Sequence, residues 1–114
     1  MKLPRIAITI GDPAGVGAEI ALKALADPTT AGLAHWILIG DGAALEAAAR
    51  TSGIGLGGLT CTLAPAPNLP EGHELGFGEL RAEYGVAAID YVRRAVEMCL
   101  AGDADAMVTA PLNK

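Results

Sequence analysis

The chain is poor in aromatic residues: one Trp, two Tyr and one Phe make up 4% of its 114 residues. A core built from this sequence must therefore be aliphatic and rich in alanine. Basic runs are also missing and the net charge is −5, which argues against the basic surface of nucleic-acid-binding proteins. No apolar run approaches the roughly 18 residues that cross a membrane, and no signal-peptide core precedes the first apolar run. These absences predict a cytoplasmic protein without nucleic-acid or membrane partners.

Cysteine and histidine are equally scarce. Cys61 and Cys99 lie too far apart in the sequence for a metal cluster, and we expect both to be small buried hydrophobes in a reducing cytosol. His35 and His73 each lack a second metal-ligating residue at suitable spacing, so each is predicted to have a surface or core role. The sequence therefore predicts no metal site within this chain.

Apolar residues make up 52% of the chain, which argues against disorder. A length of 114 residues corresponds to one domain or part of one. We find no internal repeat, no linker and no internal domain boundary. The chain stops on a lysine just after an apolar run, where an α/β unit would continue, so we expect it to be the N-terminal part of a longer protein.

Short apolar runs alternate with helical patterns. The predicted strands span residues 5–10, 36–39, 59–63 and 106–109. The first predicted helix follows the glycine-rich turn and ends near residue 26, and two further helices span residues 43–50 and 80–101. Residues 64–77 form the longest irregular segment. In the last helix, apolar residues recur at steps of three and four and form one apolar stripe. The stripe consists of Val86, Ile89, Val92, Val96, Cys99 and Leu100.

This alternation predicts a three-layer α/β/α fold around a mostly parallel sheet. In such sheets, ligands bind beyond the carboxyl ends of the strands. Three turns are predicted to lie at these ends, at residues 11–17, 40–42 and 109–114. Asp41, in the second turn, could contact a ribose hydroxyl. Asp103 and Asp105 lie in a helix-to-strand turn, where aspartate is common.

The first turn contains Gly11, Asp12, Gly15 and Gly17, between a strand and a helix. Its glycine spacing fits neither the Rossmann fingerprint nor a Walker A loop. Two interpretations remain. In one, Asp12 caps a helix that begins at Pro13, and the glycines serve packing. In the other, the loop stays open through Gly17, the free N–H groups of Gly15 to Ala18 face a phosphate or carboxylate, and Asp12 binds a substrate hydroxyl or helps to hold a metal.

The last turn contains Thr109 and Lys114. Lys114 could bind a phosphate or act as a proton donor, or it could be an exposed terminal lysine. Thr109 could cap a following element or bind a ligand oxygen.

Both turns resemble signatures of one family. Residues 8–19, ITIGDPAGVGAE, resemble the N-terminal signature of the 4-hydroxythreonine-4-phosphate dehydrogenase family, and residues 108–114, VTAPLNK, resemble its T-[AG]-P-x-x-K signature. The resemblance places Gly11, Asp12, Gly15 and Gly17 in one active-site turn, and Thr109, Pro111 and Lys114 in the other. Many members have proline where this chain has Ala18. Proline at this position would favour a helix that begins near Gly17, whereas alanine permits the same start but does not enforce it.

The resemblance implies an oxidation of 4-phosphohydroxythreonine, with decarboxylation, on the route to pyridoxal 5′-phosphate. It implies NAD or NADP and a divalent metal as cofactors, a homodimer, and a fold like that of isocitrate and isopropylmalate dehydrogenases. Close relatives use threonate or erythronate 4-phosphate. The family is about three times longer, with its metal-binding histidines beyond the second signature. We therefore expect these 114 residues to be inactive alone; a truncated, non-catalytic phosphate-binding remnant is the alternative.

Overall fold

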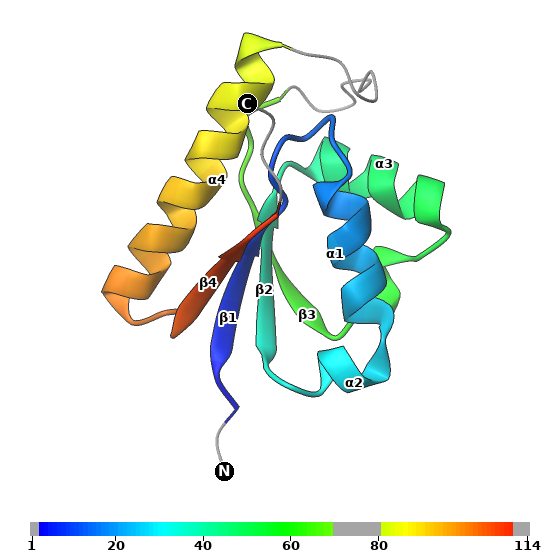
Figure 1. Cartoon of the computed structure of the whole chain (residues 1–114), viewed down its shortest axis with the longest axis vertical. Helices are drawn as coiled ribbons and strands as arrows, with labels where there is room; N and C mark the ends of the chain where they lie inside the picture. The colour runs from blue at the N-terminus through cyan, green and yellow to red at the C-terminus, as the bar shows by residue number, and fades with distance from the viewer. Residues whose placement is uncertain (1–2, 70–80, 111–114) are drawn as a thin grey trace.

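A sheet of four parallel strands forms the centre of the molecule (Figure 1). The computed structural model describes residues 3–69 and 81–110. The strands are β1 (Arg5–Thr9), β2 (His35–Gly40), β3 (Cys61–Pro65) and β4 (Ala106–Thr109), and their order in the sheet is β3-β2-β1-β4. The helices are α1 (Gly17–Ala26), α2 (Pro28–Ala31), α3 (Gly42–Ser52) and α4 (Ala82–Ala101), with a 3-10 helix, η1 (Leu56–Gly58).

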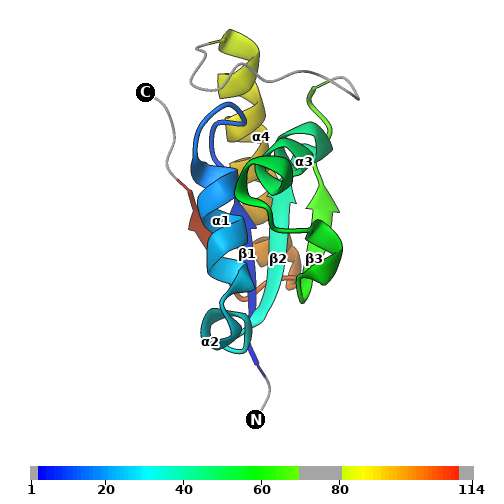
Figure 2. The same ribbon diagram turned by 90° about the vertical axis from the view of Figure 1, so that its right-hand side faces the viewer.

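The helices cover both faces of the sheet, which confirms the predicted three-layer α/β/α architecture. Helices α1 and α3 lie on one face and α4 lies on the other (Figure 2). Right-handed crossovers explain this arrangement. The chain moves outward in one direction from β1 to β2 to β3, then returns past β2 and β1 to β4. Because the direction reverses, α4 must cross on the opposite face.

The reversal creates a topological switch point between β1 and β4. These neighbours come from opposite ends of the chain, and their register pairs Ile6 with Ala106 and Thr9 with Thr109. The chain leaves the carboxyl end of β1 towards the face covered by α1, and it reaches the amino end of β4 from α4 on the other face (Figure 2). A reversal of the strand order marks the place at whose carboxyl edge open α/β sheets bind their ligands.

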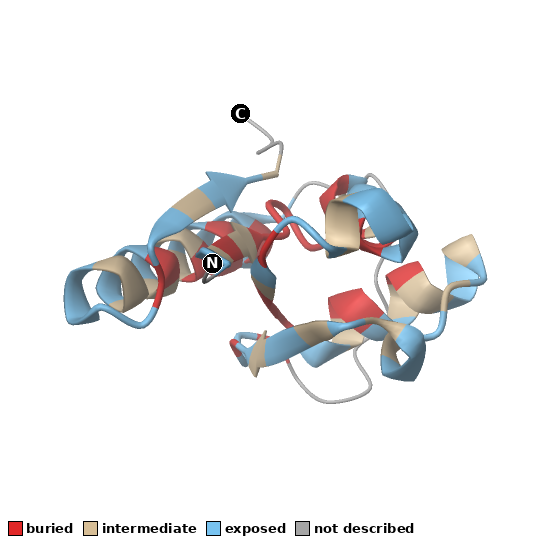
Figure 3. Cartoon of the chain, turned by 90° about the horizontal axis from the view of Figure 1, so that it is seen from below, coloured by how far each residue is buried: buried red, intermediate tan, exposed pale blue. Residues whose placement is uncertain are grey.

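The core is aliphatic and rich in alanine, as the shortage of aromatic residues predicts. Buried residues concentrate where the helices face the sheet (Figure 3). Ile10, Leu22, Leu38 and Ile39 are fully buried. The short helix α2 was not predicted from the sequence. It begins at Pro28 because the Asp27 side chain accepts a hydrogen bond from the Thr29 N–H at 2.9 Å.

The apolar stripe of α4 is not the face of the helix that is buried. Val86, Ile89 and Leu100 are 63%, 69% and 83% exposed. The buried face of the helix instead consists of Tyr84, Ala87, Ala88, Tyr91 and Ala95. Small alanine side chains let the helix approach the sheet closely, while the two tyrosines fill the remaining space. The larger aliphatic residues therefore point outward.

Two other predictions need correction. Strand β3 begins two residues later than predicted, because Leu56–Gly58 form η1 and Ala64 and Pro65 pair with Ile39 and Gly40. The first two residues of the predicted irregular segment are therefore in a strand. The two cysteines are only partly buried. Burial nevertheless raises the pKa of the Cys61 thiol.

In the described part of the chain, no helix combines the length and apolar character that a membrane crossing requires.

Candidate functional site

The glycine-rich turn follows β1 directly and is held by the side chain of Asp12. Gly11 has a φ of 74°, a left-handed conformation that favours glycine. The Oδ1 atom of Asp12 accepts a hydrogen bond from the Ala14 N–H at 2.8 Å. Its carbonyl oxygen accepts one from the Gly15 N–H at 2.9 Å, so the prediction that this N–H is free to face a ligand is wrong. Asp12 is only 8% exposed, so this aspartate is an organised part of the turn.

Helix α1 begins at Gly17, so the interpretation in which Asp12 caps a helix starting at Pro13 is wrong. The residue at the N-cap is Val16, whose side chain makes no capping bond. The first backbone hydrogen bond of the helix runs from the Ile20 N–H to the Val16 carbonyl at 3.0 Å. The N–H groups of Gly17, Ala18 and Glu19 precede this bond, and they form the positive end of the helix.

Gly17 lies where the start of α1 approaches the ends of β1 and β4. A Cβ atom at this position would lie 2.0 Å from the Ile10 carbonyl oxygen and 2.9 Å from the Cβ of Ala110. Only glycine therefore allows α1 to approach both the end of β1 and the residue that follows β4. The Ala110 N–H also donates a hydrogen bond to the Thr9 carbonyl at 2.9 Å. The first turn and the end of β4 thus meet at the switch point.

The structure places most of the predicted site residues at this edge. Gly11, Asp12, Gly15 and Gly17 form the first turn, and Thr109 ends β4 beside it with an exposed position. Pro111 and Lys114 lie outside the described residues, and their predicted roles stay predictions. The same holds for the roles in binding or catalysis predicted for the other five.

Asp41 is not available for a ribose hydroxyl. It is 1% exposed, and its Oδ1 atom accepts hydrogen bonds from the backbone N–H groups of Asn68 at 2.6 Å and Leu69 at 2.8 Å. Its Oδ2 atom accepts a hydrogen bond from the Tyr91 hydroxyl. Burial and the neighbouring Asp41 carboxylate raise the pKa of Tyr91, so this hydroxyl stays protonated. All of these hydrogen bonds to the Asp41 carboxylate come from donors within the protein, so it is not free to bind a ligand hydroxyl.

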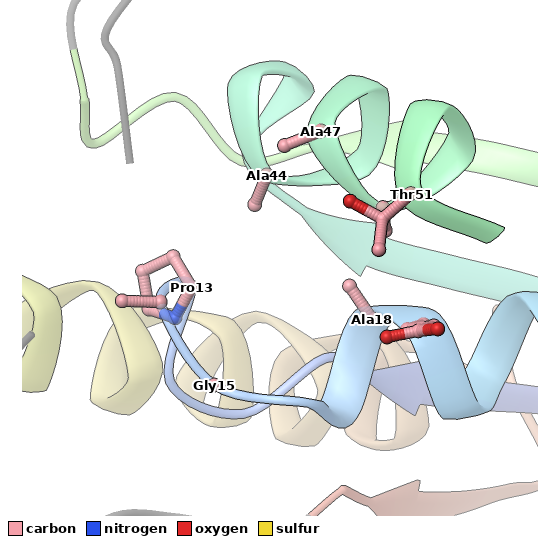
Figure 4. A pocket seen from close by; sticks show the side chains of 9 residues that line it. Pro13, Gly15, Ala18, Ala44, Ala47 and Thr51 are labelled. Carbon is pink, nitrogen blue, oxygen red and sulfur yellow. The ribbon is translucent and has the colours of Figure 1, made fainter. Parts of the chain in front are cut away.

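A small cavity lies between the first turn and α3 (Figure 4). Pro13 and Gly15 of the turn and Ala18 of α1 face Ala44, Ala47 and Thr51 of α3. Its volume is about 100 Å³, whereas pockets for small molecules usually span roughly 300–1,000 Å³. The carboxylate of Glu19, which binds Lys23 at 3.1 Å, also lines it. Size and charge therefore make this cavity unsuitable for a phosphorylated substrate.

Within residues 3–69 and 81–110, no group of three or more His, Cys, Asp or Glu side chains could hold a metal ion. His35 is exposed and begins β2, at the edge of the sheet opposite the turns. His73 lies outside the described residues. The described side chains therefore do not fit a metal site of their own.

Sequence reasoning missed three residues near this edge. The Tyr91 hydroxyl donates a hydrogen bond to Asp41, and the Asn68 side chain donates one to Asp90. Nothing in the sequence links these pairs, because their members lie far apart along the chain. Thr9 is fully buried at the end of β1, and among the described residues its Oγ1 atom has no hydrogen-bond partner. A threonine as the last residue of a buried strand, directly before a glycine-rich turn, was a signal that could have been used.

An open parallel sheet whose loops meet at a switch point defines a class: α/β proteins that bind a ligand at the carboxyl edge. Comparisons with known proteins identify the family within this class to which the chain belongs. Residues 32–114 match the family model described as "Pyridoxal phosphate biosynthetic protein PdxA". The chain belongs to this family, which confirms the resemblance found in the two signatures.

Relatives match nearly the whole chain. It is 40% identical over 97% of its length to a 4-hydroxythreonine-4-phosphate dehydrogenase of Synechococcus sp., covering 34% of that protein. It is 39% identical, again over 97%, to a protein of Symbiobacterium thermophilum named provisionally as a D-threonate 4-phosphate dehydrogenase, covering 37% of it. The crystal structure of a 4-hydroxythreonine-4-phosphate dehydrogenase from Burkholderia phymatum matches with a TM-score of 0.88 at 36% identity, over 100% of this chain and 38% of that one. The chain thus spans little more than a third of these relatives.

Proposed function

We propose that the native protein is a dehydrogenase that oxidises 4-phosphohydroxythreonine, with decarboxylation, using NAD or NADP. One observation carries the proposal: residues 108–110, which begin the second signature, lie beside β1 and the start of α1, where the first signature forms its turn. Family membership supports the reaction class, because the matched relatives are named dehydrogenases of phosphorylated hydroxy acids. We further propose a cytoplasmic homodimer, as the family resemblance implies.

In this proposal the two turns bind and orient the substrate. The N–H groups at the start of α1 bind an anionic group, since the positive end of the helix favours negative charge. The Oδ1 atom of Asp12 keeps its hydrogen bond to the Ala14 N–H, and the same carboxylate orients a substrate hydroxyl. Thr109 supplies a hydroxyl from the neighbouring strand, and Lys114 is proposed to bind the phosphate or to donate a proton.

The family resemblance also implies a divalent metal, which would polarise the oxygen of the reacting alcohol. The described residues offer no set of ligands for it. We therefore assign the metal and the nicotinamide to other parts of the native protein and derive no step through them. It follows that the 114 residues are proposed to be inactive by themselves.

A second substrate is supported by one observation. The relative named for D-threonate 4-phosphate is as similar to this chain, at 39% identity, as the one named for 4-hydroxythreonine 4-phosphate, at 40%. Both substrates carry a carboxylate, a hydroxyl on carbon 3 and a phosphate on carbon 4. The same turns could bind either, so the choice depends on the group at carbon 2.

The test is a substrate panel with the native, full-length protein. Reduction of NAD and NADP is followed with 4-phosphohydroxythreonine, D-threonate 4-phosphate and erythronate 4-phosphate, each with and without EDTA. We expect metal-dependent reduction with one of the first two. Turnover of the threonate compound alone would select the second substrate. No reduction with any of them would contradict the dehydrogenase proposal and favour a non-catalytic phosphate-binding remnant.

A further inference from the structure

The buried carboxylate of Asp41 connects three separate segments of the chain. Asp41 follows β2, and its Oδ1 atom holds the backbone N–H groups of Asn68 and Leu69, which come after β3. Its Oδ2 atom and its own N–H both bind the hydroxyl of Tyr91 on α4. A carboxylate that is 1% exposed is stable only when such donors compensate its charge. The segment after β3 is therefore held in one position.

A second contact holds the same segment to α4. The side-chain amide of Asn68 donates to the Ala66 carbonyl at 3.2 Å and to the Asp90 carboxylate at 2.8 Å. The Ala66 N–H in turn donates to the Gly40 carbonyl at 3.0 Å. Residues 66–69 are thus bonded to the end of β2 and to α4.

Leu69 connects this anchored segment to the glycine-rich turn by packing. Its side chain is 9% exposed and packs in a small buried cluster with Ala14 of the turn and Tyr84 of α4. Ala14 is the residue whose N–H binds the Asp12 carboxylate at 2.8 Å. A contiguous path of hydrogen bonds and packing therefore runs from Tyr91 through Asp41 and Leu69 to Ala14.

From this path we infer that Asp41 is a positioning residue for the substrate-binding turn. It does not touch the substrate; it places Leu69 in the cluster with Ala14 and Tyr84 and so keeps the Asp12 carboxylate and the start of α1 in their binding geometry. The inference rests on the proposed function of the turn. A residue that only stabilises the fold would affect the whole molecule, whereas a positioning residue affects the turn before the rest.

The experiment measures the turn and the kinetics separately in the native protein. Asp41→Asn keeps an acceptor for the two backbone N–H groups but replaces the oxygen that binds Tyr91 with a donor. Leu69→Ala keeps every hydrogen bond and removes only the side chain that packs in the cluster with Ala14 and Tyr84. Asp105→Asn is the control, because Asp105 also accepts a backbone N–H, that of Arg5 at 2.8 Å, but at the opposite edge of the sheet.

We expect faster deuterium uptake in residues 10–17 of both Asp41→Asn and Leu69→Ala, with unchanged uptake in α1 beyond its first turn. The KM for the phosphorylated substrate should rise about fivefold with little change in kcat. The control should change neither. If Asp41→Asn fails to fold, Leu69→Ala still gives the answer.

Unchanged uptake in residues 10–17 of Leu69→Ala would overturn the positioning role, as would equal rises throughout the protein. These outcomes are distinct from failure of the proposed function, which would appear as an inactive wild-type protein. Deuterium uptake reports on the turn even in that case.

Discussion

At the scale of single residues, glycines determine how closely the site can be assembled. Gly17 and Gly42 are each the first residue of a helix that follows a strand. A Cβ on Gly17 would collide with the Ile10 carbonyl at 2.0 Å, whereas nothing lies within 4 Å of a Cβ on Gly42. The same residue type in the same local position therefore has a packing role in one case and none in the other.

This contrast predicts different effects of the same substitution. Gly17→Ala should lower the free energy of unfolding by about 2 kcal/mol, because α1 must move away from the end of β1. Gly42→Ala should change it by no more than about 0.5 kcal/mol. Chemical denaturation of the two variants measures both values. Equal stability of the two would show that α1 does not approach the strand as the structure describes.

At the scale of elements, α4 shows where sequence patterns mislead. Val, Ile and Leu at helical spacing form its apolar stripe, but the structure buries alanines and tyrosines instead. Hydrophobicity ranks Ile above Ala, yet a helix that packs closely on a sheet needs small side chains. By contrast, the bounds predicted for β4 are confirmed, because a short apolar run between two turns leaves little ambiguity.

Two neighbouring positions on α4 test which face is buried. Ala88 is 4% exposed and Ile89 is 69% exposed. In the 114-residue chain, Ala88→Gln should destabilise the fold by about 2 kcal/mol through overpacking and a buried amide. Ile89→Gln should have an effect within about 0.5 kcal/mol. Thermal or urea denaturation compares the stability of the two variants. A larger loss of stability in Ile89→Gln than in Ala88→Gln would show that the apolar stripe is the buried face after all.

The charged residues of α4 predict how stability depends on pH. The hydrogen bond from Asn68, followed by those from Arg94 and Arg93, lowers the pKa of Asp90 from 3.8 to about 2, while burial opposes the shift. A lowered pKa favours the folded state when the carboxylate is ionised. This contribution is complete above about pH 4 and disappears as the pH falls towards 2.

Asp90→Asn should therefore remove part of the acid sensitivity between about pH 4 and pH 2. Urea denaturation across this range measures the slope, with Asp103→Asn, an exposed turn residue, as the control. A wild-type slope in the Asp90 variant would mean that the carboxylate does not form the bond to Asn68 in solution.

At the scale of the whole molecule, the topology determines where a ligand can bind. The strand order β3-β2-β1-β4 puts the first and last described strands side by side, so the glycine-rich turn after β1 becomes a neighbour of the end of β4. Alternating strands and helices predicted the parallel sheet and the edge at which the turns lie. The sequence could not predict the strand order, nor the occupied Asp41 carboxylate, because both depend on contacts between residues distant in the chain.

The most direct test of the account replaces Asp12. Asp12→Asn keeps the acceptor for the Ala14 N–H and removes the charge, and Asp27→Asn is the matched control because Asp27 makes the same type of turn with Thr29 at the start of α2. The measurement is kcat/KM of the native protein with its phosphorylated hydroxy acid. We predict a loss of about 100-fold for Asp12→Asn and none for Asp27→Asn. Wild-type kcat/KM in the folded Asp12 variant would contradict the assignment of the glycine-rich turn as the substrate site.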